Sequence, residues 1–343
     1  MSVYSVIGGC GFIGKFIVNM LLSDSLVNEI RVIDLKTENI TLIKNEVTIK
    51  YHQCDIKNLE ELVKLTSGVN VVIHCAALNN AYVNIPDEEV YSINFKGTKN
   101  VIDACITNEI EFLVFTSCMS VIGPNKTGDA FIGNEYNSYY TSFNNAYSSS
   151  KSDAEKIIIS SNGIQVGNNK TLKTCALRPT GVYGEENYML KNLYNYSKKN
   201  NNKMLMTVPK GTKSSRVYVG NVAWMHVLAA RQIQSPKSKI PGNVYFCYDN
   251  SPYCEYDQFN LFILSQLNIK EMYVPLWMLK ILSESKMLGI EKCPMLNKYM
   301  IYISSSTFIV KTNKAFIDFD YVPIFSFDES LSRTSNWIKS ICE

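Results

Sequence analysis

A glycine-rich turn near the N-terminus constrains this chain more than any other feature of its sequence. Gly9-Cys10-Gly11-Phe12-Ile13-Gly14 is a GxGxxG, preceded by Gly8, and it lies between an apolar run at Val3–Ile7 and a helix-like pattern at Phe12–Leu22. Such glycines allow a tight turn, a close approach of the backbone to a pyrophosphate, and close packing of helix on strand. The helix N-terminus then offers N–H groups to the phosphates. We therefore expect a dinucleotide-binding β-α-β unit.

An acid at a suitable distance from the turn indicates which dinucleotide is bound. Asp34 ends a second predicted strand, Ile30–Asp34, twenty residues after Gly14. A carboxylate there accepts hydrogen bonds from both adenosine ribose hydroxyls and repels a 2′-phosphate, which favours NAD over NADP. A glycine-rich turn beside a surface aspartate is the plainer alternative. Asp55 and Ile56, after the third predicted strand, fit a flank to the adenine ring, and an ordinary strand-end turn explains them equally well.

Beyond the turn, apolar strands alternate with helical patterns. Further strands are predicted at Val47–His52, Val69–His74, Phe112–Thr116 and Leu172–Leu177, with helices at about Glu88–Cys105 and Tyr147–Ile159. Repeated β-α-β alternation predicts an α/β fold of the Rossmann type, with a doubly wound parallel sheet. After about Pro179 the rhythm loosens, and Tyr196–Arg216 has the composition of a surface loop. We expect an NAD-binding core over residues 1–180 and a smaller substrate-binding region over residues 181–343, with some elements returning to the core.

Composition excludes several classes of protein. With 46% hydrophobic and 19% charged residues, the 343-residue chain is typical of globular proteins and unlike disordered ones. The net charge of +3 gives no reason to expect nucleic-acid binding. No apolar stretch reaches the roughly 18 residues of a membrane span. The ten cysteines are scattered without CxxC spacing, and the turn at Gly8 begins too early for a signal peptide. We therefore predict no metal site, and reduced thiols in the cytoplasm.

A tyrosine and a lysine form the second constellation. Tyr147 and Lys151 are four residues apart, so on a helix they share a face and point into one space. The ammonium favours the phenolate, which can take a proton from an alcohol while a hydride leaves the same carbon for a nicotinamide. Lys151 can also hold the nicotinamide ribose hydroxyls. With 21 tyrosines in the chain, a YxxxK pattern arises easily by chance. It supports a catalytic pair here because of its position, at the start of the helix that follows the fifth predicted strand.

Several motifs resemble those of extended short-chain dehydrogenases/reductases, in the same order. They are GGCGFIG at Gly8–Gly14, HCAA at His74–Ala77, NFKGT at Asn94–Thr98, YSSSK at Tyr147–Lys151 and RPTGVYG at Arg178–Gly184. Three more resemble the 3β-hydroxysteroid dehydrogenase/Δ5→4-isomerase family, namely TSCMSVIGPN at Thr116–Asn125, RVYVGNVAWMH at Arg216–His226 and YFCYD at Tyr245–Asp249. The resemblance spans nearly the whole chain and is strongest toward the poxvirus-encoded members.

This resemblance implies a role for individual residues. Tyr147 is the general acid/base, Lys151 supports its phenolate, and Asn94 orients a water or backbone near Lys151. The NAD-binding set comprises Gly8, Gly11, Phe12, Ile13, Gly14, Asp34, Asp55, Ile56, Ala76, Ala77, Lys151 and Pro179, with His74 beside Ala76. The implied reaction, in steroid hormone biosynthesis, is NAD-dependent oxidation of a 3β-hydroxy-Δ5-steroid to the 3-ketone, followed by a double-bond shift. Asp249 matches one acid of that second step, and a solvated strand-end residue is an equal alternative.

Two positions depart from the family pattern. Ile7 stands where the motif usually has threonine. Cys118 stands where the family has the serine that hydrogen-bonds the substrate oxygen, so Cys118 takes that place in the predicted catalytic set. A thiol is a weak donor, and losing one such donor lowers the rate by about a hundredfold or more. The chain is then a slow enzyme, an enzyme rescued by Ser117 or Ser120, or an NAD-binding regulator, and its intact motifs favour activity.

Other features leave alternatives open. A nucleotide-sugar epimerase would share every nucleotide motif, but it needs polar and basic groups in the C-terminal part, where the surroundings of Trp277 are apolar. Met272–Leu282 is expected to line the pocket, with a lid or a shallow membrane contact as alternatives. Helix packing explains the aromatic residues of Tyr188–Tyr196, and Phe327–Ile341 is expected to be a closing amphipathic helix. The expected partner is a steroid, and no nucleic acid. A homodimer, a peripheral membrane contact and a host-cell cytoplasm, if the chain is viral, stay open.

Overall fold

Helices and strands alternate along most of the chain. The computed structural model describes residues 2–37, 40–44, 46–80, 85–124, 128–139, 141–143, 145–206, 211–273, 275, 277–278 and 306–342. The helices are α1 (Phe12–Leu21), α2 (Leu59–Thr66), α3 (Asp87–Tyr91), α4 (Thr98–Thr107), α5 (Ala146–Ser160), α6 (Tyr188–Lys199), α7 (Val219–Gln232), α8 (Tyr256–Ser265), α11 (Lys314–Phe319) and α12 (Phe327–Cys342), with a π-helical segment η1 (Ser92–Gly97) and a short 3₁₀ turn η2 (Met119–Val121). The strands are β1 (Ser2–Ile7), β2 (Val27–Asp34), β3 (Ile40–Lys44), β4 (Val47–Gln53), β5 (Val71–His74), β6 (Phe112–Thr116), β7 (Phe131–Gly133), β8 (Gln165–Gly167), β9 (Lys170–Thr171), β10 (Lys173–Pro179), β11 (Gly181–Tyr183), β12 (Lys203–Met206), β13 (Arg216–Tyr218), β14 (Asn243–Cys247), β15 (Lys270–Tyr273) and β16 (Phe308–Val310).

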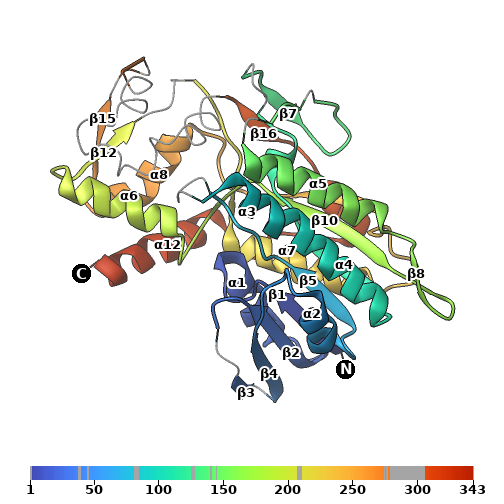
Figure 1. Cartoon of the computed structure of the whole chain (residues 1–343). Coiled ribbons are helices and arrows are strands. Elements are labelled where there is room, and N and C mark those ends of the chain that lie inside the picture. The colour runs from blue at the N-terminus through green and yellow to red at the C-terminus, as the bar shows by residue number, and fades with distance from the viewer. Residues whose placement is uncertain are drawn as a thin grey trace.

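The main sheet has the strand order of a doubly wound fold. Its order is β14-β10-β6-β5-β1-β2-β4-β3, and every neighbouring pair is parallel except β3 and β4. The chain therefore builds outward from β1 through β2 and β4, returns to β5, and builds the other way through β6, β10 and β14 (Figure 1). The crevice at the carboxyl ends of β1 and β5, where the direction reverses, is the place where such sheets bind ligands. The predicted Rossmann-type α/β fold is confirmed.

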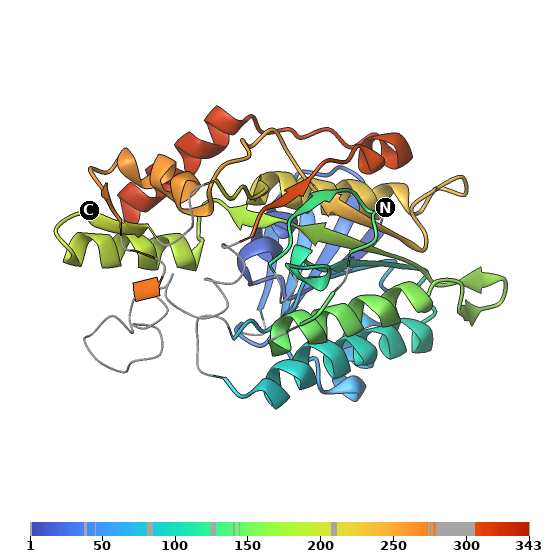
Figure 2. The same cartoon turned by 90° about the horizontal axis from the view of Figure 1, so that it is seen from above.

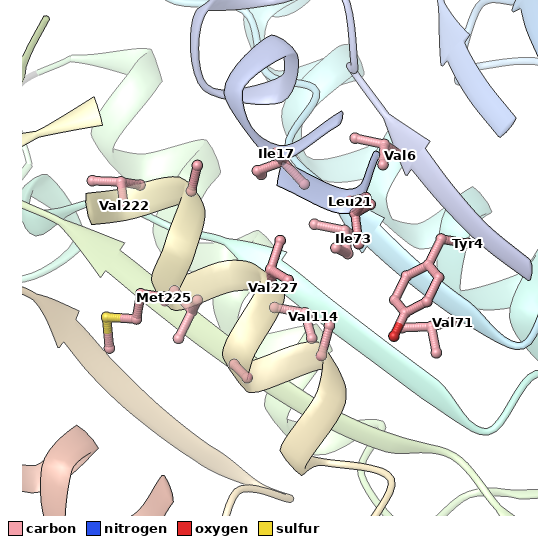
Figure 3. Close-up of a cluster of buried hydrophobic side chains, with 14 of the residues drawn as sticks. Tyr4, Val6, Ile17, Leu21, Val71, Ile73, Val114, Val222, Met225 and Val227 are labelled. Atoms are coloured by element: carbon pink, nitrogen blue, oxygen red, sulfur yellow. The ribbon is translucent and has the colours of Figure 1, made fainter. Parts of the chain in front are cut away.

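Helices cover both faces of this sheet. α1 and α7 pack on one face, while α2, α4 and α5 cover the other. Figure 2 shows the sheet between α7 (yellow) on one side and α4 (teal) and α5 (green) on the other. In Figure 3, side chains from α1, α7 and the strands gather in one cluster, namely Tyr4, Val6, Ile17, Leu21, Val71, Ile73, Val114, Val222, Met225 and Val227. Burying one such aliphatic side chain stabilises the fold by about 1.5–3 kcal/mol. This core fixes the carboxyl edge of the sheet.

A second, smaller cluster belongs to the C-terminal part of the chain. α6, α8, α12, β12 and β15 lie together at the upper left of Figure 1, and their buried side chains include Leu193, Phe259, Ile263 and Ile338. α6 contributes Met189, Leu190 and Leu193 to this core, so packing does explain the apolar residues of Tyr188–Tyr196. α12 forms where the amphipathic helix was expected, and α7 and β14 join the main sheet layer.

Three sequence expectations need correction or stay untested. The loop expected over Tyr196–Arg216 is wrong in part, because β12 occupies Lys203–Met206 and pairs with β15, far away in sequence. The helix expected at about Glu88–Cys105 is interrupted by η1, and α2 and β3 were not predicted. Most of Met272–Leu282 lies outside the described residues, so its role stays a prediction. Trp277, which is among the described residues, is exposed. None of the described helices combines the length and the apolar character needed to cross a membrane.

Candidate active site

The glycine-rich turn folds against the segment that follows β5. Gly8 has a φ of 85°, and a Cβ on it would overlap the backbone of Ala76. A Cβ on Gly14 would overlap the Gly8 carbonyl oxygen and lie 2.7 Å from the Gly9 Cα. Gly11 is the N-cap of α1 and brings no side-chain cap, so the first-turn N–H groups of Phe12 and Ile13 face no capping side chain. These features fit a dinucleotide pyrophosphate, because side chains would fill the cradle and a cap would compete for the N–H groups.

Asp34 ties the end of β2 to this turn. Its Oδ2 accepts a hydrogen bond from the Cys10 backbone N–H at 3.0 Å, and its Oδ1 accepts one from the Lys36 N–H at 2.9 Å. A carboxylate has about four acceptor positions, so these two bonds leave capacity for ribose hydroxyls. The residue therefore lies at the turn, as the spacing predicts.

Asp55 and Ile56 form a turn after β4. The Asp55 carboxylate accepts from the Lys57 N–H at 2.9 Å, and its carbonyl accepts from the Asn58 N–H at 2.8 Å. Ile56 is buried, and a Cβ on Gly97 would lie 2.5 Å from the Ile56 Cδ1. The contacts give direct support to the ordinary turn, while a flank to the adenine ring stays a prediction.

Lys151 lies inside the protein, one helical turn after Tyr147. Its side chain is 2% exposed, its Nζ donates to the Thr116 carbonyl at 2.6 Å, and the ammonium lies 4.0 Å from the centroid of the Phe115 ring. Burial lowers the pKa of Lys151 to about 8, while Cys118 and Glu155 act to raise it. Tyr147 is half-buried in the first turn of α5. The ammonium is thus fixed behind the phenol-bearing turn of the helix, close to the end of β6.

Asn94 joins three segments around Lys151. Its Nδ2 donates to the Leu78 carbonyl at 2.9 Å and to the Ser150 Oγ at 3.0 Å, and its Oδ1 accepts from the Leu78 N–H at 2.7 Å. The residue is buried in η1, and π-helical insertions are frequent at functional sites. Asn94 therefore holds backbone beside Lys151, one of the two arrangements that the sequence motif implied.

Cys118 has a hydroxyl as its neighbour. The Cys118 Sγ and the Ser120 Oγ lie 2.9 Å apart at the carboxyl end of β6. Ser117 has another task, because its hydroxyl donates to the Glu155 carboxylate at 2.6 Å. Glu155 in turn pairs with Arg178 through bonds of 2.8 and 2.5 Å. Of the two serines flanking Cys118, only Ser120 has its hydroxyl beside the thiol.

His74 ends β5 in a neutral form. Thr98 donates its hydroxyl proton to the Asn94 carbonyl at 2.6 Å, so the His74 Nε2, 3.0 Å from the Thr98 Oγ1, is assigned as the donor nitrogen. Burial lowers the pKa of His74 to about 3. Its Nδ1 accepts no hydrogen bond within the described part of the chain. One buried acceptor at the end of β5 therefore has no hydrogen-bond donor among the described residues.

Comparison with known proteins decides the family. Residues 5–278 match the model of the 3-beta hydroxysteroid dehydrogenase/isomerase family. The chain belongs to this family. It is 43% identical over 343 residues to the "3 beta-hydroxysteroid dehydrogenase/Delta 5-->4-isomerase" of Vaccinia virus (strain Ankara), covering 99% of each chain. It is 38% identical to "3 beta-hydroxysteroid dehydrogenase type 7" of Mus musculus, over 99% of this chain and 96% of that one.

Solved structures of other enzymes share the fold. One is the dTDP-glucose 4,6-dehydratase DesIV of Streptomyces venezuelae, solved with NAD bound, with a TM-score of 0.74, 17% identity, and coverage of 98% of this chain and 97% of that one. Another is a UDP-galactose 4-epimerase, with a TM-score of 0.71, 16% identity, and coverage of 99% and 100%. At these identities the likeness concerns the fold alone.

The steroid-family motif at Arg216–His226 has a clear structural role in this family member. Asp249 accepts from the Tyr218 N–H at 2.8 Å, the Asn221 Nδ2 at 3.0 Å and the Ser251 N–H at 2.9 Å. Asn221 also donates to the Phe325 carbonyl at 3.0 Å. The half-buried carboxylate of Asp249 therefore fixes the start of α7 and is not a freely solvated side chain. Its isomerase role stays a prediction.

Sequence reasoning missed two supports of the site. The His226 Nδ1 donates to the Val222 carbonyl at 2.7 Å, so its Nε2 accepts from the Thr116 hydroxyl at 2.8 Å. Burial lowers the pKa of His226 to about 4, so it stays neutral. This contact holds the strand end whose carbonyl receives Lys151. The second support is the Ser117–Glu155–Arg178 network. Both join segments far apart in sequence. The only sequence signal for them is that His226, Ser117 and Arg178 lie within the motifs that resemble the family.

One further polar group lies at the end of β10. Pro179 ends the strand and is buried, and Thr180 follows it with 5% exposure. Within the described residues the Thr180 hydroxyl has no hydrogen-bond partner. Pro179, Thr180 and the His74 ring thus belong to the carboxyl ends of the strands. The family resemblance implies that His74 and Pro179 line the nicotinamide and pyrophosphate, and this stays a prediction.

Proposed function

We propose that this chain catalyses NAD-dependent oxidation of a 3β-hydroxy-Δ5-steroid to the 3-ketone, followed by Δ5→4 isomerisation. The observation that carries this proposal is the position of Tyr147 and Lys151, on the first turns of α5, beside the end of β6 and the Asn94 clamp. Family membership supports the substrate class, since relatives that match along their whole length are named for this chemistry.

The residues that would hold NAD are those around the glycine-rich turn. Gly8, Gly11 and Gly14 would leave room for the pyrophosphate, and the N–H groups of Phe12 and Ile13 at the start of α1 would donate to it. Asp34 has acceptor capacity for the adenosine ribose, and Ala76, Ala77 and Pro179 would line the nicotinamide side. When bound there, NAD supplies the hydride acceptor. These assignments rest on the fit of the cradle and on the NAD-bound enzymes of the same fold.

Proton transfer falls to α5 and its neighbours. Tyr147 as phenolate takes the proton of the 3β-hydroxyl, and the Lys151 ammonium stabilises the phenolate charge. The pKa of about 8 leaves Lys151 mainly protonated at neutral pH, and the Thr116 carbonyl keeps it in place. Cys118 and Ser120 would donate the hydrogen bond that the substrate oxygen needs, and their 2.9 Å contact supports this shared role. For the later proton shift, Asp249 is the candidate acid/base, although its three N–H donors also fit a purely structural task.

One assay tests both halves of the reaction. The purified protein is given NAD with pregnenolone or dehydroepiandrosterone, and NADH and the conjugated enone are followed separately, with Tyr147→Phe as the inactive control. We expect both products. NADH without the enone would remove the isomerase half. Absence of turnover despite measurable NAD binding would favour the NAD-binding regulator.

A nucleotide-sugar enzyme is the second candidate, for one specific reason. A nucleotide-sugar enzyme needs basic groups in the C-terminal part of the chain, and Arg216 is a buried cation in that part. Turnover of UDP-glucose in place of the steroids would support this candidate. Three further predictions accompany the main proposal. They are the division into an NAD-binding core and a substrate-binding region at about residue 180, a location in the host-cell cytoplasm, and a homodimer.

A further inference from the structure

A buried carboxylate, that of Glu155, lies one helical turn beyond Lys151 on α5. Tyr147, Lys151 and Glu155 are spaced four residues apart, so they follow one another along one side of the helix. Lys151 and Glu155 are both buried, which is rare for these residue types unless the charge has a partner. The proposed reaction uses the first two residues of this row and leaves the third without a task.

Lys151 and Glu155 are bonded to consecutive residues at the end of β6. The Lys151 Nζ donates to the Thr116 carbonyl at 2.6 Å, and the Ser117 hydroxyl donates to the Glu155 Oε2 at 2.6 Å. Because consecutive Cα atoms are about 3.8 Å apart, these two bonds bring the ammonium and the carboxylate close together between α5 and the strand end. In a buried place a charge acts strongly over such a distance. Glu155 therefore puts a negative charge beside Lys151.

Arg178 holds this carboxylate from the neighbouring strand, β10, along which α5 lies (Figure 1). Its Nε and Nη2 donate to the two Glu155 carboxylate oxygens at 2.8 and 2.5 Å. Leu177, the residue before Arg178, accepts from the Ser117 N–H at 2.7 Å. Two paired strands thus fix the carboxylate in one position.

The other groups around Lys151 differ from Glu155 in charge. Burial lowers the pKa of His74 to about 3 and raises the pKa of Cys75 to about 12, so both are neutral at neutral pH. The described titratable or charged groups around Lys151 are Tyr147 and Glu155 on α5, His74 and Cys75 at the end of β5, Cys118 after β6, and Arg178 behind Glu155 on β10. Glu155 is the carboxylate of this described set.

We infer that Glu155 is a positioning residue of the dehydrogenase, whose fixed negative charge keeps Lys151 positively charged behind Tyr147. The inference rests on the proposed function, because the ammonium matters to catalysis only where Tyr147 acts as a phenolate. Burial lowers the pKa of Lys151 to about 8, and the charge of Glu155 is among the interactions that oppose this shift. Glu155 thus acts through Lys151.

The titration of Lys151 itself tests the inference with no substrate present. The protein is labelled with ¹³C at the lysine Cε atoms, and the Lys151 signal is assigned by its loss in Lys151→Met. In the unmodified protein this signal should titrate near pH 8. In Glu155→Gln the midpoint should move to lower pH by about half a pH unit or more, because the carboxylate charge is lost while the nearby guanidinium stays.

Arg178→Gln provides the opposite test. It leaves the Glu155 carboxylate without its cation, so the midpoint of Lys151 should move to higher pH. Damage to packing would shift both single variants in the same direction, whereas a charge effect gives opposite directions. Glu155→Gln/Arg178→Met removes both charges and leaves neither unpaired, so it guards against a single variant that fails to fold. Its midpoint should lie between those of the two single variants.

Asp153→Asn is the matched control on the same helix. Asp153 lies two residues before Glu155, and its partly exposed carboxylate pairs with Lys156 at 3.0 Å. Removing this carboxylate should leave the midpoint of Lys151 unchanged. The inference would be overturned by shifts of the same direction in Glu155→Gln and Arg178→Gln, by no shift in either, or by an equal shift in Asp153→Asn.

Steroid turnover separates this inference from the proposed function. In Glu155→Gln we expect kcat at neutral pH to fall by about tenfold, with its alkaline decline moved to lower pH. If no 3β-hydroxysteroid reduces NAD while the midpoints of Lys151 still shift in opposite directions, Glu155 positions Lys151 and the proposed reaction falls. Turnover of pregnenolone by Glu155→Gln at the unmodified rate and with the unmodified pH profile would leave the reaction and remove the positioning role.

Discussion

The Cys118 thiol and the Ser120 hydroxyl lie 2.9 Å apart just after β6, and two residues before Cys118 the Thr116 carbonyl accepts a hydrogen bond from the Lys151 ammonium. Either atom can act as the donor of this pair. When the thiol donates to the Ser120 oxygen, the serine proton is free to point elsewhere, and when the serine donates, it polarises the thiol. Ser117 is excluded from this role by its bond to Glu155. We therefore propose this pair as the group that donates a hydrogen bond to the substrate oxygen.

Replacing Cys118 by serine tests whether the thiol limits the rate. A hydroxyl is a stronger and smaller donor than a thiol, so Cys118→Ser should keep or raise the steroid-dependent production of NADH, by up to about a hundredfold. Initial rates at saturating NAD measure this, with steroid affinity determined alongside. A sharp fall in turnover, with NAD binding intact, would show that sulfur has a role of its own.

Ser120 should matter more in the natural chain than in that variant. Ser120→Ala is expected to lower kcat by about tenfold or more when residue 118 is cysteine, because no other hydroxyl in the described part of the chain is bonded to the thiol. In the Cys118→Ser background the same change should have a much smaller effect, since neighbouring groups that share a task are not additive. Ser160→Ala, at the exposed end of α5, serves as the control. Equal losses in both backgrounds would contradict the shared role.

Gly8 and Gly68 offer a matched pair for the cofactor cradle. Both have positive φ, 85° and 74°, so alanine is strained at each by a similar amount, about 1 kcal/mol. Around Gly68 a Cβ meets nothing within 4 Å, whereas at Gly8 it overlaps the Ala76 backbone. Gly8→Ala should therefore weaken NAD binding by about tenfold or more, and Gly68→Ala should leave it unchanged. Titration with NAD measures both, and equal affinities would argue against the cradle.

The Glu155–Arg178 pair should support the site through stability. Both side chains are largely buried, at 9% and 12% exposure, and Glu155 also receives the Ser117 hydroxyl. Glu155→Gln leaves the guanidinium without its anion and should lower the free energy of unfolding by about 3 kcal/mol. Glu186→Gln breaks the exposed pair with Lys15 and should lower it by less than about 1 kcal/mol. Urea unfolding measures both variants, and equal losses in the free energy of unfolding would contradict this prediction.

Local pattern was enough to predict the parts of this molecule that follow one another in the chain. β1, the glycine turn, α1 and Asp34 lie within one β-α-β unit, and α5 begins one residue before the predicted start at Tyr147. The supports of the site come from elsewhere. His226 meets Thr116 across 110 residues, and β12 finds its partner β15 in a strand 67 residues further on. The hydrophobic periodicity of the sequence does not predict such pairings, because they form only in the completed sheet and its C-terminal layer.

Lys151 should make the stability of the protein depend on pH in a definite direction. Its pKa is about 8 in the folded protein and 10.5 when unperturbed, so between these values the unfolded chain binds more protons. Stability therefore rises with pH through this window, and burial of the charge is most unfavourable below pH 8. Over the whole window the gain amounts to about 3 kcal/mol, at about 1.36 kcal/mol for each pH unit.

Lys151→Met isolates this contribution from the other lysines and tyrosines. The free energy of unfolding of both proteins is measured by urea from about pH 7 to pH 10.5, and the difference between them is plotted against pH. We expect the free energy of unfolding of the unmodified protein to rise by about 3 kcal/mol relative to that of the variant across the window, because only Lys151 differs. A difference that stays flat would mean that the buried lysine keeps its ordinary affinity for the proton, and that its ammonium persists unchanged in alkaline solution.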